Sequence, residues 1–184
     1  MDTFTEILVR RKTTVKDIAL VVVVVLSAVL IAGLALLLIP VLYQFASLLL
    51  LLAVGAGVGA WFLATATRVE YEYILTNGEL DVDQITAKRK RKRLISVGCP
   101  KFEEMAPYEP QKLAARRFQT KLFACDSVGG ENVWYAVFRH QNAGTTLLVF
   151  NMSERLMKGM QGFLPKEIQH EINLRHRSGV PQAD

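Results

Sequence analysis

An almost uninterrupted apolar stretch, residues 18–66, constrains this chain more than any other feature. It contains no Asp, Glu, Lys, Arg or His. A helix rises about 1.5 Å per residue, so about 20 apolar residues cross a bilayer core of roughly 30 Å. Residues 18–39 and residues 45–66 each meet that length. The sequence therefore predicts two transmembrane helices.

The short connection between the two spans predicts a tight hairpin. Pro40 cannot continue the first helix without losing a backbone hydrogen bond. Tyr43 and Phe45 fit an interfacial aromatic belt at this end, and Trp61 and Phe62 fit one at the other end. Two full-length spans argue against a re-entrant hairpin. A cleaved signal peptide is also disfavoured, because the apolar run is too long and a second span follows at once.

Flanking charges predict the orientation of the hairpin. Four basic residues precede the first span: Arg10, Arg11, Lys12 and Lys16. Arg68 follows the second span, and the connection carries no charge. Lys and Arg collect on the cytoplasmic side of a membrane. We therefore expect a multi-pass plasma-membrane protein with both termini cytoplasmic, in which residues 1–17 form a basic cytoplasmic lead.

Small residues mark candidate packing faces within the spans. Gly55 and Gly59 are four residues apart in the second span, and so are Ala28 and Ala32 in the first. Such residues let helix backbones approach closely. We favour packing of the two spans against each other, and the alternative is a homodimer formed through the glycine face. Proton relays and ion paths need ionisable groups, so the sequence predicts an anchor.

A polar domain, residues 67–174, follows the hairpin and begins with a strand pattern. Residues 69–75 alternate with period two, which points Tyr71 and Tyr73 toward a core and Glu70 and Glu72 toward water. The pair Asn77-Gly78 follows, the strongest short signal for a β-hairpin. The sequence predicts a return strand over residues 80–87.

The predicted hairpin creates an acidic face that needs a counter-charge. Glu70, Glu72, Asp81 and Asp83 fall on one face, and like charges across a strand pair repel each other. A basic block follows, made of Lys88, Arg89, Lys90, Arg91, Lys92 and Arg93. A third strand that begins in this block would bring its side chains against the acidic face. Because side chains on a strand alternate, three of the six can pair there while three face elsewhere.

Two other uses of the charged hairpin remain open. The block could bind anionic lipid head groups, an attraction of roughly 1 kcal/mol per basic residue near the surface. It could also bind nucleic acid, or the carboxylates could bind a metal ion. Outside the block the domain has more acidic than basic residues, which argues against a broad nucleic-acid footprint.

The rest of the domain predicts further strands and a closing helix. Residues 118–125, 133–138 and 145–150 are strand candidates, and residues 98–110, with three prolines, are predicted to be irregular. Ser153 is a candidate N-cap for an amphipathic helix over residues 154–164. A second helical stretch is expected over residues 166–174. Residues 175–184 are expected to form a flexible tail.

No set of residues indicates catalysis. Cys99 and Cys125 are expected to be free thiols in a cytoplasmic domain. His140, His170 and His176 are scattered, with no zinc-site spacing. No nucleotide-binding loop is present, since the Gly-Gly pair at residues 129–130 lacks the Gly-Lys-Ser/Thr ending. We therefore expect no catalytic residues, no metal and no cofactor, and predict that the protein is not an enzyme.

The predicted fold class is α+β. It comprises a two-helix transmembrane hairpin and a small antiparallel β domain, closed by a C-terminal amphipathic helix. The chain resembles bacterial inner-membrane families in four features. These are the apolar hairpin, the Asn77-Gly78 hairpin between acidic strands, the basic block and the helix over residues 154–164. These families join a two-span hairpin to a pleckstrin-homology-like (PH-like) domain. The resemblance implies a membrane-associated interaction module and brings no reaction. An anchor without ionisable groups, joined to a small β domain without a catalytic set, leads us to expect an interaction or scaffold module with an unidentified protein partner. Phosphoinositide recognition does not follow, because no motif for it matches these residues.

Overall fold

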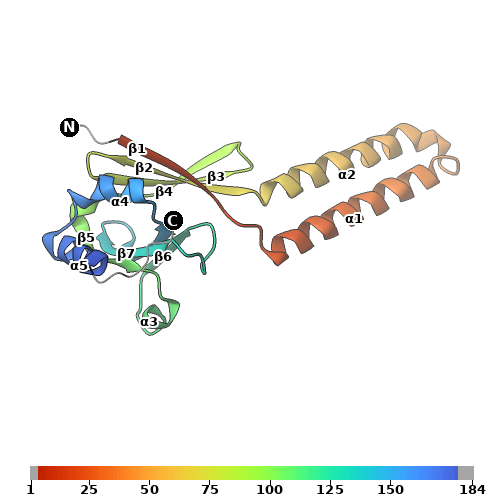
Figure 1. Ribbon diagram of the computed structural model, residues 1–184. Coiled ribbons are helices and arrows are strands. Elements are labelled where there is room, and N and C mark those ends of the chain that lie inside the picture. The colour runs from red at the N-terminus through yellow and green to blue at the C-terminus, as the bar shows by residue number, and fades with distance from the viewer. Residues whose placement is uncertain (1–3, 178–184) are drawn as a thin grey trace. The chain divides into compact units, whose positions relative to one another are not determined.

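The computed structural model describes residues 4–177, which form two compact units (Figure 1). The helical unit consists of residues 13–69 and 86–89. The β domain consists of residues 4–12, 70–85 and 90–177. The long helices are therefore an insertion within the β domain, and the two units are described separately below.

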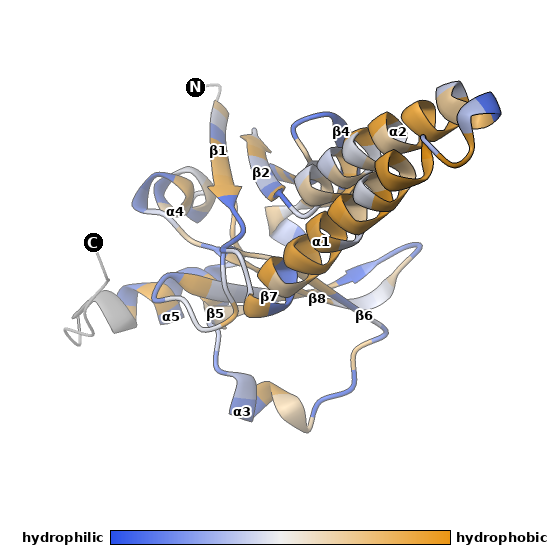
Figure 2. Ribbon diagram, turned by 90° about the vertical axis from the view of Figure 1, so that its right-hand side faces the viewer, coloured by the Kyte–Doolittle hydropathy of each residue, from blue (hydrophilic) through white to orange (hydrophobic). Residues whose placement is uncertain are grey.

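The helical unit is built from two long helices. α1 (Val15–Leu38) is followed by the single-turn helix η1 (Tyr43–Phe45) and by α2 (Ala46–Ala66). The Asp17 carboxylate accepts a hydrogen bond of 3.0 Å from the Thr14 N–H, which caps the start of α1. Both helices are long and apolar enough to cross a membrane. Figure 2 shows the hydrophobic colour along both of them.

Most of the large apolar side chains of these helices are exposed. In α1, which is described in full, only Ala35 is buried, and α2 has no buried residue along its described length. In water such a surface would be costly, at about 25 cal/mol per Å² of apolar area. Length, composition and exposure together suggest a membrane anchor, in agreement with the two spans expected from the sequence.

The first sheet of the β domain has the order β1-β2-β3-β4. Its strands are β1 (Phe4–Arg10), β2 (Val69–Thr76), β3 (Glu79–Thr86) and β4 (Lys90–Gly98). β1 pairs antiparallel with β2, from Phe4 opposite Thr76 to Arg10 opposite Glu70. The interpretation of residues 1–17 as a basic lead was therefore wrong for this strand. Apolar residues on both of its faces, such as Leu8 beside Val9, hide the period of two.

Short turns join β2 to β3 and β3 to β4. Asn77 (φ 49°) and Gly78 (φ 83°) both have positive φ, as the predicted type I′ hairpin requires. A side chain at position 78 is also excluded by space, because a Cβ there would lie 2.5 Å from Cγ of Phe163. Ala87 and Lys88, each with φ 55°, form the equivalent turn between β3 and β4.

The second sheet has the order β5-β7-β8-β6 and includes one parallel pair. Its strands are β5 (Phe102–Pro107), β7 (Val133–His140), β8 (Gly144–Asn151) and β6 (Thr120–Ala124). β6 runs parallel to β8, whereas the sequence pattern had suggested only successive antiparallel strands. The predicted irregular connection holds η2 (Cys99–Lys101) and β5. β5 tolerates its terminal Pro107 because it is an edge strand.

Three helices complete the β domain: α3 (Pro110–Ala114), α4 (Glu154–Gln161) and α5 (Lys166–Arg177). The predicted N-cap is confirmed, since Oγ of Ser153 accepts a hydrogen bond of 3.2 Å from the Leu156 N–H. α4 buries Leu156 and Met160, and α5 buries Ile172. The backbone of α5 continues to Arg177, three residues into the stretch expected to be a tail. The remainder of that stretch, residues 178–184, lies outside the described residues.

Tyr73 of β2 links the two sheets at the centre of the core. Its ring meets the Phe150 ring edge-on, with centroids 6.1 Å apart. The buried hydroxyl donates a hydrogen bond to the Ala124 carbonyl oxygen and accepts one of 3.1 Å from the Asn151 N–H. The α+β class expected from the sequence is confirmed, as is a C-terminal helix packed on the β domain.

Candidate functional site

The basic block begins in the β3–β4 turn and continues into β4. Lys88 and Arg89 belong to the helical unit, and residues 90–93 belong to the β domain. All six residues of the block are exposed to solvent. Their partners separate them into two classes, which are the three arginines and the three lysines.

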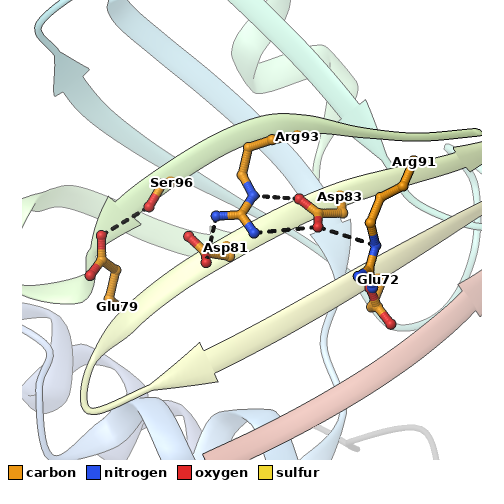
Figure 3. A network of polar contacts seen from close by, with 7 residues as sticks. All are labelled: Glu72, Glu79, Asp81, Asp83, Arg91, Arg93 and Ser96. Atoms are coloured by element: carbon orange, nitrogen blue, oxygen red, sulfur yellow. Dashed lines mark hydrogen bonds and ion pairs between the residues drawn. The ribbon is translucent and has the colours of Figure 1, made fainter.

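Two of the arginines neutralise the acidic sheet face, as Figure 3 shows. Nε of Arg93 lies 2.5 Å from Oδ1 of Asp83, and its Nη1 lies 2.7 Å from Oδ2 of Asp81. Arg91 forms an ion pair with Glu72, and its Nε lies 3.4 Å from Oδ2 of Asp83. The hydrogen bond to Asp83 raises the pKa of Arg93 above its ordinary value. Pairing of the block with the neighbouring acidic strands is therefore confirmed for Arg91 and Arg93.

The acidic face is less open than the strand pattern predicted. Glu70 and Glu72 were expected to face water, but they are only 9% and 6% exposed. Arg10 covers Glu70, with Nε of Arg10 3.0 Å from Oε1 of Glu70, and Arg91 covers Glu72. A buried carboxylate is costly unless a cation is paired with it. These side chains thus hold the sheet together and leave little acidic surface for a ligand.

The three lysines of the block have no such partners. Lys88, Lys90 and Lys92 are exposed, and none of them forms an ion pair within residues 4–177. They alternate along the chain with the three engaged arginines. The block therefore presents three free ammonium groups to its surroundings.

Arg89 is held by the aromatic end of α2, inside the helical unit. Its guanidinium carbon lies 4.4 Å from the Phe62 ring centroid and 5.3 Å from that of Trp61. Its Nη2 donates a hydrogen bond of 2.7 Å to Oγ1 of Thr65. Cation–π contacts of this kind contribute about 0.5–2 kcal/mol, depending on desolvation.

The same turn is fixed to the chain that leaves α2. The Ala87 N–H donates a hydrogen bond of 2.8 Å to the Arg68 carbonyl oxygen. Ala87 and Lys88 are both non-glycine residues with positive φ, a conformation that costs free energy and is kept only when the surroundings impose it. The Arg68 contact and the Arg89 contacts supply that restraint.

A groove of about 410 Å³ lies between α1 and α2. Ala28 and Ala32, which the sequence had marked as packing residues, are half-buried and line it together with Gly57. Gly55 and Gly59 lie outside the groove, where they are exposed and where an added Cβ would meet no atom within 4 Å. Packing through Gly55 and Gly59 therefore stays a prediction.

Cys99 and Cys125 are buried free thiols. Burial raises the pKa of Cys99 to about 12 and that of Cys125 to about 11. A thiol reacts as the thiolate, so neither side chain suits nucleophilic chemistry near neutral pH. Across residues 4–177, no three or more His, Cys, Asp or Glu side chains are grouped so that they could hold a metal ion.

Sequence reasoning missed two features of this region. The first is the role of Arg10, whose signal was the β-prone run of residues 4–10 that pairs with β2. The second is the contact of Arg89 with Trp61 and Phe62, which had been assigned only to an interfacial belt. No local pattern announces this contact, because it joins residues that are distant in the sequence.

Comparison with known proteins places this chain in a family. The comparisons with curated proteins and with solved structures found no match. A family model described as "Bacterial PH-like domain (DUF6106)" matches residues 1–170. That span includes the inserted helices, both sheets and α4. The chain therefore belongs to the bacterial PH-like domain family DUF6106.

Proposed function

We propose that this protein is a membrane-anchored, non-enzymatic PH-like module that holds a protein partner at the cytoplasmic face of the plasma membrane. The observation that carries the proposal is the insertion of two exposed apolar helices between β1 and β2. Arg10 and Glu70 stand opposite each other in the same ladder. The chain must therefore leave and re-enter the β domain at one place, as two membrane crossings require.

Charge supports the cytoplasmic side for that domain. Arg10, Arg11, Lys12 and Lys16 precede α1, Arg68 follows α2, and the connection between the helices is uncharged. Positive residues near membrane helices favour the cytoplasm. The proposed topology has both termini and the PH-like domain on the cytoplasmic side of the bilayer.

The test is recovery of a partner by the intact chain. Full-length protein, affinity-tagged after Asp184, is purified from detergent-solubilised membranes beside a control that keeps residues 13–67 but carries an unrelated soluble domain. We expect a defined protein at near-stoichiometric amount with the full chain and none with the control. Recovery of only monomeric or self-associated protein contradicts the proposal, as does release of the full chain from membranes by carbonate.

A second candidate function is contact with anionic lipid head groups through Lys88, Lys90 and Lys92. The observation that favours it is their exposure without ion pairs, while the neighbouring arginines are engaged. Each basic residue near an anionic surface contributes roughly 1 kcal/mol.

Hydrogen exchange of the full chain in nanodiscs tests this candidate. We expect slower amide exchange over residues 86–92 in nanodiscs with phosphatidylglycerol than in those with phosphatidylcholine alone. The triple variant Lys88→Gln, Lys90→Gln, Lys92→Gln should lose the difference. A control with equal charge loss, Lys101→Gln, Lys112→Gln, Lys158→Gln, should keep it. If both variants respond alike, the effect is general electrostatics and the candidate fails.

A further inference from the structure

The groove between α1 and α2 has the properties of a hydrocarbon site. Its floor is formed by small residues, because Ala28 and Ala32 of α1 face Gly57, Ala60 and Ala64 of α2. Trp61 forms part of its wall, and every lining residue is apolar. Its volume of about 410 Å³ lies within the range of small-ligand sites, roughly 300–1,000 Å³.

A cation lies beside Trp61, one of the residues that line this groove. Trp61 lines the groove and also stacks with Arg89, whose guanidinium carbon is 5.3 Å from the Trp61 ring centroid. The guanidinium also bonds to Thr65, near the end of α2. A guanidinium has five N–H donors, and Arg89 has no carboxylate partner in the part of the chain that the structure describes. The site thus combines an apolar groove with a positively charged guanidinium that has further N–H donors for a ligand.

The charge of the site decides between two possible occupants. A helix from a second copy would fit the apolar groove, but the one carboxylate within α1 and α2, that of Asp17, already accepts the hydrogen bond from the Thr14 N–H of its own chain. An anionic phospholipid supplies both parts, since its acyl chain is apolar and its phosphate suits the planar fork of a guanidinium. We propose that the groove holds one acyl chain of an anionic phospholipid from the surrounding bilayer, with the lipid phosphate bound to Arg89. The inference rests on the proposed membrane insertion of the two helices.

Fluorescence quenching of Trp61 by brominated lipid tests the proposal on the full chain. The chain has two tryptophans, so Trp134→Phe leaves Trp61 as the reporter. Proteoliposomes contain either brominated phosphatidylglycerol in phosphatidylcholine or brominated phosphatidylcholine in phosphatidylglycerol. The ratio of quenching gives the preference for the anionic lipid at Trp61. We expect a preference of roughly fivefold, the effect of about one basic residue at a membrane surface.

Two matched pairs of variants locate the site. Arg89→Gln should abolish the preference, whereas Arg68→Gln, an exposed cation just after α2, should keep most of it. Gly57→Leu fills the groove and should bring the preference close to one. Gly59→Leu, outside the groove and with open space around it, should leave it unchanged.

Several outcomes overturn the proposal. Equal quenching of the parent protein by both lipids removes the anionic site, and so does an equal loss with Arg68→Gln and Arg89→Gln. Quenching of Trp61 by neither lipid shows that protein fills the groove. If Gly57→Leu does not insert, the Arg89 and Arg68 variants decide.

Carbonate extraction of the same proteoliposomes separates this inference from the proposed function. If the parent protein is released, the anchor itself is refuted and the lipid site fails with it. If the protein stays in the bilayer but shows no lipid preference, only the lipid site fails.

Discussion

Arg10 and Glu70 flank the two long helices, yet they are register partners in the β1–β2 ladder and form an ion pair of 3.0 Å between Nε and Oε1. The residues on either side of the insertion are therefore joined to each other by a strand pair of the β domain. This pairing requires the chain to return to the side from which it left, whatever the insertion does between those points.

Thiol accessibility should show that topology. Single cysteines at Thr13 and Arg68, in a background with Cys99→Ser and Cys125→Ser, should react with a membrane-impermeant maleimide only after the cells are opened. A cysteine at Tyr43, in the connection between the helices, should react in intact cells. Different behaviour of positions 13 and 68 would contradict two crossings.

The ion pairs of the acidic sheet face should matter more than the free lysines. Arg93→Gln leaves the nearly buried Asp83 without its closest cation. Because Arg93 itself is half-exposed, we expect a loss on the order of 2 kcal/mol of unfolding free energy, below the value for a fully buried pair. Lys92→Gln, one residue away, should change it by less than about 0.5 kcal/mol. Thermal unfolding of both variants in the same detergent checks this. If both variants lose the same unfolding free energy, the ion pairs of Arg93 do not stabilise the sheet.

The Tyr73 hydroxyl should stabilise the junction of the two sheets. Tyr73→Phe leaves the Ala124 carbonyl and the Asn151 N–H without this partner, at a cost of about 1–3 kcal/mol. Tyr108→Phe, at a half-buried ring, should cost much less. The unfolding free energies are compared from denaturant unfolding curves with equal slopes. If Tyr73→Phe leaves the unfolding free energy unchanged, the hydroxyl does not stabilise the junction of the sheets.

Asp126 should contribute to loss of stability in acid. Burial opposes its ionisation, but hydrogen bonds from Asn151, Lys12 and Ser127 outweigh burial and lower its pKa below the ordinary value of 3.8. A carboxyl with a lowered folded pKa stabilises the protein above its unfolded pKa, and this contribution is lost as the pH falls through the folded pKa. Asp126→Asn should thus be less stable than the parent at pH 7, and the gap should narrow below about pH 4. If the difference in stability between the two proteins widened in acid, the pKa of Asp126 in the folded protein would not be lowered.

Thiol chemistry should report the burial of the two cysteines. With a pKa of about 12 for Cys99 and about 11 for Cys125, both should resist alkylation at pH 7.5 in the folded protein and react on unfolding. Mass spectrometry after iodoacetamide treatment, with and without denaturant, checks each site separately. Rapid native labelling of Cys99, whose side chain is fully enclosed, would show that the domain opens locally.

Features of this protein that depend on local sequence could be predicted, and those that depend on distant partners could not. Asn77-Gly78 and Ser153 act through their own neighbours, so the turn and the helix cap followed directly from their residue types. Residues 4–10 are β-prone, but the pairing of β1 could not be predicted, because its partner strand lies beyond both long helices. The parallel pairing of β6 with β8 likewise depends on how the chain crosses the second sheet.

The basic block illustrates the same limit within a single motif. Alternation predicted that only half of its side chains would meet the acidic strands. It could not predict that the third arginine, Arg89, would leave that face for Trp61 and Phe62. The position of Arg89 follows from the turn at Ala87 and Lys88, which the Arg68 carbonyl restrains. Neither residue type predicts such a turn.

The position of β1 also dictates the order in which the protein can be made. The ribosome releases β1 first and must then complete α1 and α2 before β2 emerges to receive it. With the helices delivered to the bilayer as proposed, the cytoplasmic domain can close only after insertion has begun. A nascent chain that is not inserted into the membrane keeps two long apolar segments between β1 and β2. Membrane insertion of the helices is therefore needed both for correct targeting and for correct folding of the first sheet.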